Sequence, residues 1–444
     1  MRKGIVRVGV VLAGLLLLMA SLVYMSDSPA LAGSGTVGSG GSQAVAPSVG
    51  GERGLAPRPR TNTPTRTPTR TPTRTPTRTP TPMNTPTNTP IPSCGLFWRD
   101  VPAAHPGSAL YGIEVVSAND IWAVGLSYEG TIARTLIEHW NGTQWTIVPS
   151  PNVGTESTYL FELSAVSASD IWAIGTHNGR TLALHWDGTQ WSIVATPNPG
   201  TRENYLLDVE AVSANDVWAV GYFRSESPYP FQMFIAHWDG KSWSQVPSPN
   251  TGFFSNVLTS VDAISANDIW AVGYSMAQNA PASQTRTLTI HWDGSSWSVV
   301  PSGSFNQLNS VSAVSSNDVW AVGSNELYHI TMHWNGSFWS EVPSPEPGNN
   351  SINLNDVEAI SSNDVWAVGY YESLEVGGTV PLMIHWDGTQ WNQVERDWGT
   401  APDFLTAVDA VSSTDVWAAG YNYTDGLFFV HYSDPCALPD GGKR

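Results

Sequence analysis

The stretch HYSDPC at residues 431–436 is the last and incomplete copy of a block that occurs six more times in the chain. A complete copy, such as HWDGTQW at residues 185–191, has His-Trp, then Asp-Gly or Asn-Gly, then two residues and a second Trp. The complete copies begin at His139, His185, His237, His291, His333 and His385. The seventh copy stops at a cysteine before the second Trp, so its missing part has to be sought elsewhere in the sequence.

A second motif, Ser-x-x-Asp-[Ile/Val]-Trp-Ala-x-Gly, precedes each block and shows that the region is a repeat. Its copies are spaced 46 to 52 residues apart and begin at Ser117, Ser167, Ser213, Ser265, Ser315, Ser361 and Ser412. Each unit predicts four short strands. The first reads like LLDVEAV at residues 206–212, the second contains the Trp motif, and the third ends at His-Trp. An Asn-Gly or Asp-Gly turn, which is a strong hairpin signal, leads into the fourth.

The second strand of each unit is apolar on both faces, because alternate side chains of a strand point to opposite sides. Trp122 and Val124 point one way, while Ile121 and Ala123 point the other. Each small sheet must therefore pack between two neighbours. Seven four-stranded antiparallel units covered in this way predict an all-β, seven-bladed β-propeller. A linear solenoid is the alternative.

The two ends of the repeat region favour the closed ring. In CGLFWRDVP at residues 94–102, Trp98 and Val101 match the Trp and Val-Pro of the fourth strand elsewhere. The N-terminal segment is therefore predicted to complete the seventh blade. The two loose ends of the cut turn carry the only two cysteines of the chain, and we predict a Cys94–Cys436 disulfide that closes the ring.

The residues before Cys94 predict an exported protein with a long linker before its folded part. Three basic residues precede an apolar run at 8–25, and a small-residue site ends at Ala32, so residues 1–32 are predicted to be a secretory signal peptide. An uncleaved membrane anchor is the alternative. Residues 33–93, rich in Gly and Ser and then in Thr, Pro and Arg, predict a disordered linker of extended polyproline type. The propeller then spans 94–436, followed by a tail at 437–444. We expect a secreted, cell-surface or envelope location.

Charge divides the chain at the same point. Of the 20 Lys and Arg and the 38 Asp and Glu residues, ten basic and two acidic ones precede Cys94, so the remainder carries ten basic and 36 acidic residues, a net charge of −26. Nucleic acid is therefore excluded as a partner, and a membrane contact is expected only through an uncleaved anchor. We expect a monomer that binds a glycan or an extracellular protein.

The Trp-containing motifs resemble those of secreted bacterial β-propeller repeat proteins and in particular the repeats of tectonin-type propellers, which carry a similar Val-Trp-Ala/Gly-Val strand. This resemblance covers residues 94–436 and implies glycan or protein binding, because tectonin-like propellers include lectins and interaction modules. The turn WDGTQW also distantly resembles the Asp-box of sialidase-like propellers. That box has one residue between Asp and Gly, whereas Asp187 and Gly188 are adjacent here.

Candidate ligand-binding residues lie in the loops that differ between units. The connections from the fourth to the first strand and from the second to the third share one face of a propeller, called here the top face. Its mixture of aromatic and polar side chains is typical of recognition surfaces. The candidates are Arg202, Tyr222, Arg224, Tyr274, Arg286, Tyr370 and Trp398. Arg134, Arg180 and Arg286 share one repeat position, which indicates a partly structural role for them.

Acidic residues recur three positions before each Ser of the motif, on the strand nearest the axis. They are Glu114, Glu210, Asp262, Glu358 and Asp409, with serines in the other two units. Glu162, Asp208 and Asp356 stand two positions further back. We expect these residues to line a water-filled polar channel. A ring of carboxylates also suits a hard cation, so the alternative is a metal site, with Ca²⁺ as the cofactor.

The chain shows none of the common catalytic motifs. The His of each His-Trp and the Asp of each Ser-x-x-Asp lie at the same end of a blade, but seven equivalent pairs predict a structural bond rather than an active site. We expect a non-catalytic binding module for a glycan or protein. The alternatives are a glycan-active enzyme, either a hydrolase or a lyase, and a structural envelope component.

Overall fold

The computed structural model describes residues 95–105, 107–225, 230–249, 251–281, 284–324, 328–347, 351–398, 403–422 and 426–434. These residues all belong to one compact unit, 92–444. Among them, no helix is both long and apolar enough to cross a membrane. The predicted signal peptide, linker and tail lie outside the described residues, as do Cys94 and Cys436.

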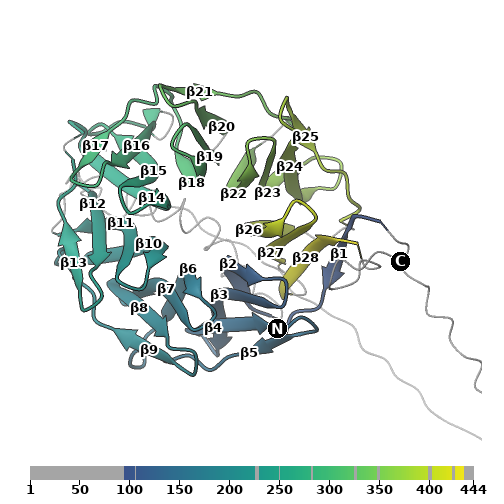
Figure 1. Ribbon diagram of the computed structural model, residues 1–444, viewed down its shortest axis with the longest axis horizontal. Coiled ribbons are helices and arrows are strands. Elements are labelled where there is room, and N and C mark those ends of the chain that lie inside the picture. The colour runs from purple at the N-terminus through teal and green to yellow at the C-terminus, as the bar shows by residue number, and fades with distance from the viewer. Residues whose placement is uncertain are drawn as a thin grey trace, which may run out of the picture. The chain divides into compact units, whose positions relative to one another are not determined.

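Seven four-stranded antiparallel sheets form a ring, in which the first strand of each sheet lies nearest the centre (Figure 1). Blade 1 contains β2 (Ala109–Ser117), β3 (Asp120–Glu129), β4 (Ile132–Trp140) and β5 (Trp145–Ile147). Blade 2 contains β6 (Thr158–Ser167), β7 (Asp170–His177), β8 (Arg180–Trp186) and β9 (Trp191–Val194). Blade 3 contains β10 (Glu203–Ser213), β11 (Asp216–Arg224), β12 (Gln232–Trp238) and β13 (Trp243–Val246). Blade 4 contains β14 (Ser255–Ser265), β15 (Asp268–Met276), β16 (Arg286–Trp292) and β17 (Trp297–Val299).

The remaining three blades follow the same order. Blade 5 contains β18 (Leu308–Ser315), β19 (Asp318–Ser324), β20 (His329–Trp334) and β21 (Trp339–Glu341). Blade 6 contains β22 (Ile352–Ser361), β23 (Asp364–Ser373), β24 (Gly378–Trp386) and β25 (Trp391–Gln393). Blade 7 contains β26 (Asp403–Ser412), β27 (Asp415–Asn422), β28 (Gly426–Ser433) and, from the other end of the chain, β1 (Phe97–Val101). The predicted seven-bladed propeller is therefore confirmed.

Neighbouring blades are joined by clusters of three aromatic rings. The buried Trp122 of β3 lies 5.1 Å from Trp186 and 5.8 Å from Trp191 of the next blade, measured between ring centroids. The same arrangement recurs around the ring, and it fills the wedge between two twisted sheets with large side chains. The repeated Trp residues are therefore packing residues.

The closing blade reproduces the pattern with residues from both ends of the chain. Trp98 of β1 pairs with Tyr432 of β28, and both rings lie 5.4 Å from Trp366 of blade 6. The amide of Gly95 donates a hydrogen bond to Asp434 Oδ1 at 3.0 Å, so the cut turn is still bridged. The N-terminal strand thus supplies the missing fourth strand, as predicted. The disulfide itself lies outside the described residues and stays a prediction.

The Gly that ends each Trp motif is required by a close approach of the inner strand. A β-bulge between Leu206 and Asp208 shifts the register of β10 and brings its backbone against β11. A Cβ atom on Gly221 would lie 2.1 Å from the carbonyl oxygen of Tyr205. Because any larger residue would collide with this backbone, the motif keeps Gly at this position.

Candidate functional site

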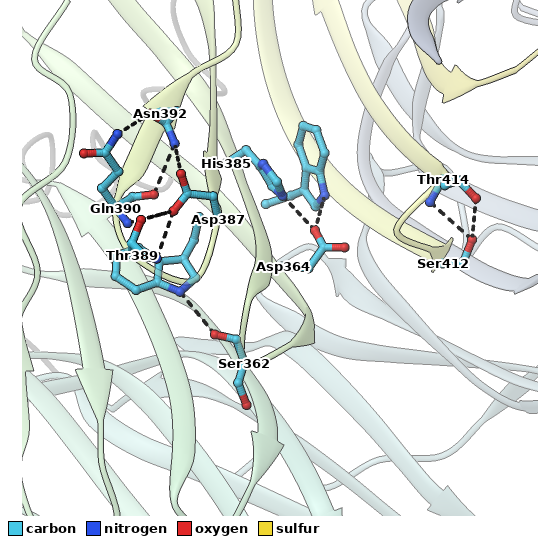
Figure 2. A network of polar contacts seen from close by, with 11 residues as sticks. Ser362, Asp364, His385, Asp387, Thr389, Gln390, Asn392, Ser412 and Thr414 are labelled. Carbon is cyan, nitrogen blue, oxygen red and sulfur yellow. Dashed lines mark hydrogen bonds and ion pairs between the residues drawn. The ribbon is translucent and has the colours of Figure 1, made fainter. Parts of the chain in front are cut away.

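The bottom face of the ring, which carries the Ser-x-x-Asp and Asp-Gly turns, is built from bonds that recur from blade to blade. In blade 6, Asp364 Oδ1 accepts hydrogen bonds from His385 at 2.8 Å and from the indole of Trp366 at 3.0 Å (Figure 2). Nearby, Asp387 Oδ1 accepts from the backbone amides of Thr389 and Gln390. A His–Asp pair 2.6 to 2.8 Å long occurs in all seven blades. The predicted pairs are therefore confirmed as structural bonds.

The carboxyl groups of the predicted acidic ring link one blade to the next. All seven side chains of this level stand opposite the Trp of the second strand. Asp262 Oδ2 accepts a hydrogen bond from the amide of Ala313 in the following blade at 2.6 Å. Asp409 Oδ2 accepts from Val115 at 2.5 Å and so joins the last blade to the first.

The serines that replace the acid in the other two blades also accept a hydrogen bond from a backbone amide of the next blade. Ser164 Oγ accepts from the amide of Ala211 at 3.0 Å, and Ser312 Oγ accepts from Ala359 at 3.0 Å. An uncharged hydroxyl can therefore replace the carboxylate in this role. We conclude that the ring satisfies buried backbone amides between blades, which is a structural role.

Burial raises the pKa of every carboxyl group at these positions of the inner strands. The pKa rises to about 7 for Asp208 and Asp409 and to about 6 for Asp262 and Asp356. The glutamates at both levels, namely Glu114, Glu162, Glu210 and Glu358, have pKa values well above the usual range, because burial and neighbouring acids both disfavour charge. Among the described residues, no group of three or more His, Cys, Asp or Glu side chains is arranged to hold a metal ion. The geometry therefore gives the Ca²⁺ prediction no support.

Three of the predicted ligand-binding residues are buried under the top face. Tyr222 and Tyr274 are each 8% exposed and belong to one apolar cluster, and Tyr222 stacks on Tyr205 with 5.0 Å between ring centroids. Arg224 is 6% exposed and forms an ion pair with Glu203 at 2.6 Å. In this structure these side chains support the top-face loops from below and present no surface to a ligand.

Three more predicted residues are in part accessible. Arg202 is exposed, and Tyr370 is half-buried with its ring 4.7 Å from that of Phe404. Trp398 is half-buried against the core of the last blades, beneath the guanidinium of Arg396 at 4.5 Å. Trp398 therefore has a packing role as well as some exposed surface.

Arg286 is the predicted residue with the most distinctive surroundings. It is exposed, and its guanidinium carbon lies 4.2 Å from the ring centroid of Phe305 and 5.8 Å from that of Phe253. Both distances lie within the range of cation–π attraction. We name Phe253, Phe254, Arg286, Phe305 and Tyr328 the arginine–aromatic cluster. The four aromatic residues are all exposed, with Phe305 at 54% and Tyr328 at 66%.

The backbone holds this cluster in place from two sides. Thr287, next to Arg286, donates its amide to the carbonyl of Ser304 at 3.1 Å, which positions Phe305 beside the guanidinium. On the other side, Asn256 Nδ2 donates to the carbonyl of Phe253 at 3.3 Å. Asn306, which is buried, donates to the carbonyl of Tyr328 at 3.4 Å. The site is therefore largely preformed, and binding would cost little ordering of the loops.

The other two arginines at this repeat position lack these neighbours. Arg134 forms an ion pair with Glu129 at 3.1 Å and donates to the carbonyl of Glu156. Arg180 is exposed on the hairpin between β7 and β8, and no aromatic ring stacks on it among the described residues. Among the described residues, Arg286 forms no ion pair. Its guanidinium edge is therefore available to a ligand.

Sequence reasoning identified Arg286 but missed the four aromatic residues of the cluster. Phe253 and Phe254 lie in TGFFSN at 251–256, and Phe305 lies in SGSFNQ at 302–307, both in connections from a fourth to a first strand. A signal was present, because Phe occurs in these two connections and in none of the other described ones between blades. Tyr328 comes from the loop between β19 and β20.

Solved structures share this fold at low sequence identity. YCF48 bound to a D1 peptide aligns over 76% of this chain and 94% of its own, with a TM-score of 0.51 and 14% identity. U3-55K aligns over 76% of this chain and 98% of its own, with a TM-score of 0.52 and 9% identity. The xyloglucanase of glycoside hydrolase family 74 from Xanthomonas campestris has a TM-score of 0.50 and 13% identity over 73% of this chain and 53% of its own. No protein-family model matches the sequence, and neither does a curated protein. These likenesses show the propeller fold alone.

Proposed function

We propose that this protein is a secreted or cell-surface binding module that recognises an extracellular ligand, a protein or a glycan, at the arginine–aromatic cluster. The observation that carries the proposal is the exposed Arg286 held between Phe253 and Phe305 by fixed backbone contacts. Arg and aromatic residues are enriched at recognition surfaces, and rigid scaffolds commonly present such residues on loops.

Strand polarity supports this role. β1 runs from Phe97 at the bottom face to Val101 at the top, antiparallel to β28. The chain therefore enters the ring at the bottom face, whereas Arg286 begins β16 at the top face. The cluster therefore lies on the face of the ring opposite to the one at which β1 begins.

A non-catalytic role fits the acids near the cluster. Among the described residues, Glu341 accepts a hydrogen bond from Ser304, next to Phe305. Glycoside hydrolysis commonly needs two carboxyl groups facing one bond. A propeller of this fold can bind a peptide, since the similar YCF48 structure contains a bound peptide.

A glycan array and a display library of random peptides, both probed with the full chain, test the proposal together. Arg286→Ala and Arg180→Ala serve as matched variants, because both arginines are exposed at the same repeat position. The proposal is supported if the chain binds a glycan or a peptide, if Arg286→Ala weakens this binding, and if Arg180→Ala leaves it unchanged. Binding that survives Arg286→Ala, or no binding in either screen, contradicts it. Running the array with and without Ca²⁺ also tests the metal prediction.

A further inference from the structure

We infer that the ligand of the arginine–aromatic cluster is a protein segment that presents a carboxylate beside aromatic or aliphatic side chains. This inference rests on the proposed function and names the class of partner. It follows from what remains accessible on Arg286, from the aromatic residues around it and from the charge of the propeller.

The first argument concerns the guanidinium. A guanidinium is a planar fork of N–H donors, and its faces stack on aromatic rings while its edge pairs with carboxylates. Here the guanidinium carbon lies over Phe305 at 4.2 Å and near Phe253 at 5.8 Å. These stacked rings shield the group in part from water and hold it in one orientation. A carboxylate approaching the edge would therefore meet a fixed pair of donors.

The aromatic residues favour a protein over a sugar. A sugar ring binds by stacking on the open face of an aromatic ring, but the guanidinium already lies over one face of Phe305. Phe253, Phe254, Phe305 and Tyr328 are all exposed, and the rings of Phe253 and Phe305 lie next to the guanidinium of Arg286. Aromatic residues around an Arg are typical of the energetic centre of protein interfaces.

The net charge of the propeller limits which residues can flank this carboxylate in the partner. The chain after Cys94 carries a net charge of −26, and Glu341 and Glu346 are exposed on the blade that carries Phe305's loop. A strongly acidic partner would be repelled by this surface, whereas neutral or basic flanks would be attracted. The expected segment therefore has one acidic residue next to apolar ones, within a neutral or basic context.

The experiment is selection of random peptides displayed on phage against the full chain, with the selected peptides then synthesised. We expect an enriched pattern that contains Asp or Glu adjacent to aromatic or aliphatic residues, with Lys or Arg further away. We expect Arg286→Ala to weaken the affinity for the synthetic peptide by about 10-fold or more, because a charge-assisted pair is lost. Arg286→Lys should recover only part of the loss, since Lys lacks the planar fork.

Two controls make the inference falsifiable. Arg180→Ala should change the affinity by less than about 2-fold, and replacing the peptide's acid by its amide should match the loss seen with Arg286→Ala. Selected peptides without an acidic residue, or peptides whose binding ignores Arg286, would overturn the inference. If the glycan array gives Arg286-dependent binding and no peptide is selected, the inference fails while the proposed function stands. If both screens are negative, both fail.

Discussion

Asp356 illustrates how single residues hold this ring together. Its Oδ2 accepts from the amide of Val408 in the next blade at 2.8 Å, and its Oδ1 accepts from the Ser310 hydroxyl at 2.7 Å. One carboxyl group thus accepts hydrogen bonds from polar groups of the two neighbouring blades. An unsatisfied buried amide costs about 1–3 kcal/mol.

We predict that Asp356→Ala lowers the free energy of unfolding by about 1–3 kcal/mol at pH 5, where the carboxyl, with its pKa of about 6, is mostly uncharged. Asp356→Asn keeps one acceptor oxygen and should cost less. Urea denaturation measures both changes. The exposed Glu372→Ala is the control and should change stability by less than about 0.5 kcal/mol. Equal effects for Asp356→Ala and Glu372→Ala would show that the inter-blade bond contributes nothing.

The strand β1 is the element on which closure depends. This strand pairs with β28 through its backbone, and its Arg99 also donates a hydrogen bond to His431 Nδ1 at 2.9 Å. In the other blades a smaller polar residue stands at the position of Arg99. Gly95, which follows Cys94, and Asp434, two residues before Cys436, are joined by a hydrogen bond. This placement supports the predicted disulfide.

We predict no reactive thiol in the folded protein without reductant and two after reduction. Closing so long a loop stabilises the fold by up to about 5–6 kcal/mol in the chain-entropy model, so reduction should lower the urea midpoint markedly. Thiol titration and denaturation with and without reductant measure these effects. A Cys94→Ser, Cys436→Ser double variant should match the reduced protein and no longer respond to reductant. Two reactive thiols in the oxidised protein would refute the pairing.

Elements were easier to predict from the sequence than contacts. The strands, the ring and its closure follow from repeated motifs, and Trp98 matches its repeat position by inspection. The burial of Tyr222 and Arg224 could not be predicted, because it depends on packing between loops of two blades that differ in sequence. Arg286 was identifiable by position, but its stacking on Phe305 depends on the bond between Thr287 and Ser304, which local sequence does not reveal.

At the scale of the whole molecule, the set of acids on the inner strands makes stability depend on pH. Its eight carboxyl groups have raised pKa values in the folded state, so they keep protons that the unfolded chain loses above about pH 4. Their contribution is complete at low pH and is lost as pH rises through about 6 to 7. His177, His329 and His431, whose pKa values are lowered by burial, act in the opposite direction but are fewer.

We predict that the free energy of unfolding is greatest near pH 4, where the unfolded carboxyl groups begin to lose their protons, and falls as pH rises through about 7. Urea denaturation across pH 4 to 8 measures the profile, and Asp208→Asn should flatten it, because the pKa of Asp208 is about 7. A maximum at pH 7.5 or above would contradict the assignment. Adding Ca²⁺ at pH 8 tests the metal prediction separately, since a bound ion would raise the melting temperature with its concentration.

The most direct test of the central claim, that the top-face cluster binds the ligand, is hydrogen exchange of the full chain with and without a saturating amount of the tightest selected peptide. We predict slower amide exchange at residues 251–256, 284–287 and 301–308, which surround Arg286, Phe253 and Phe305. The bottom-face turns, such as residues 186–191, should exchange at the same rate in both samples. Protection at those turns, with no change around Arg286, would contradict the account.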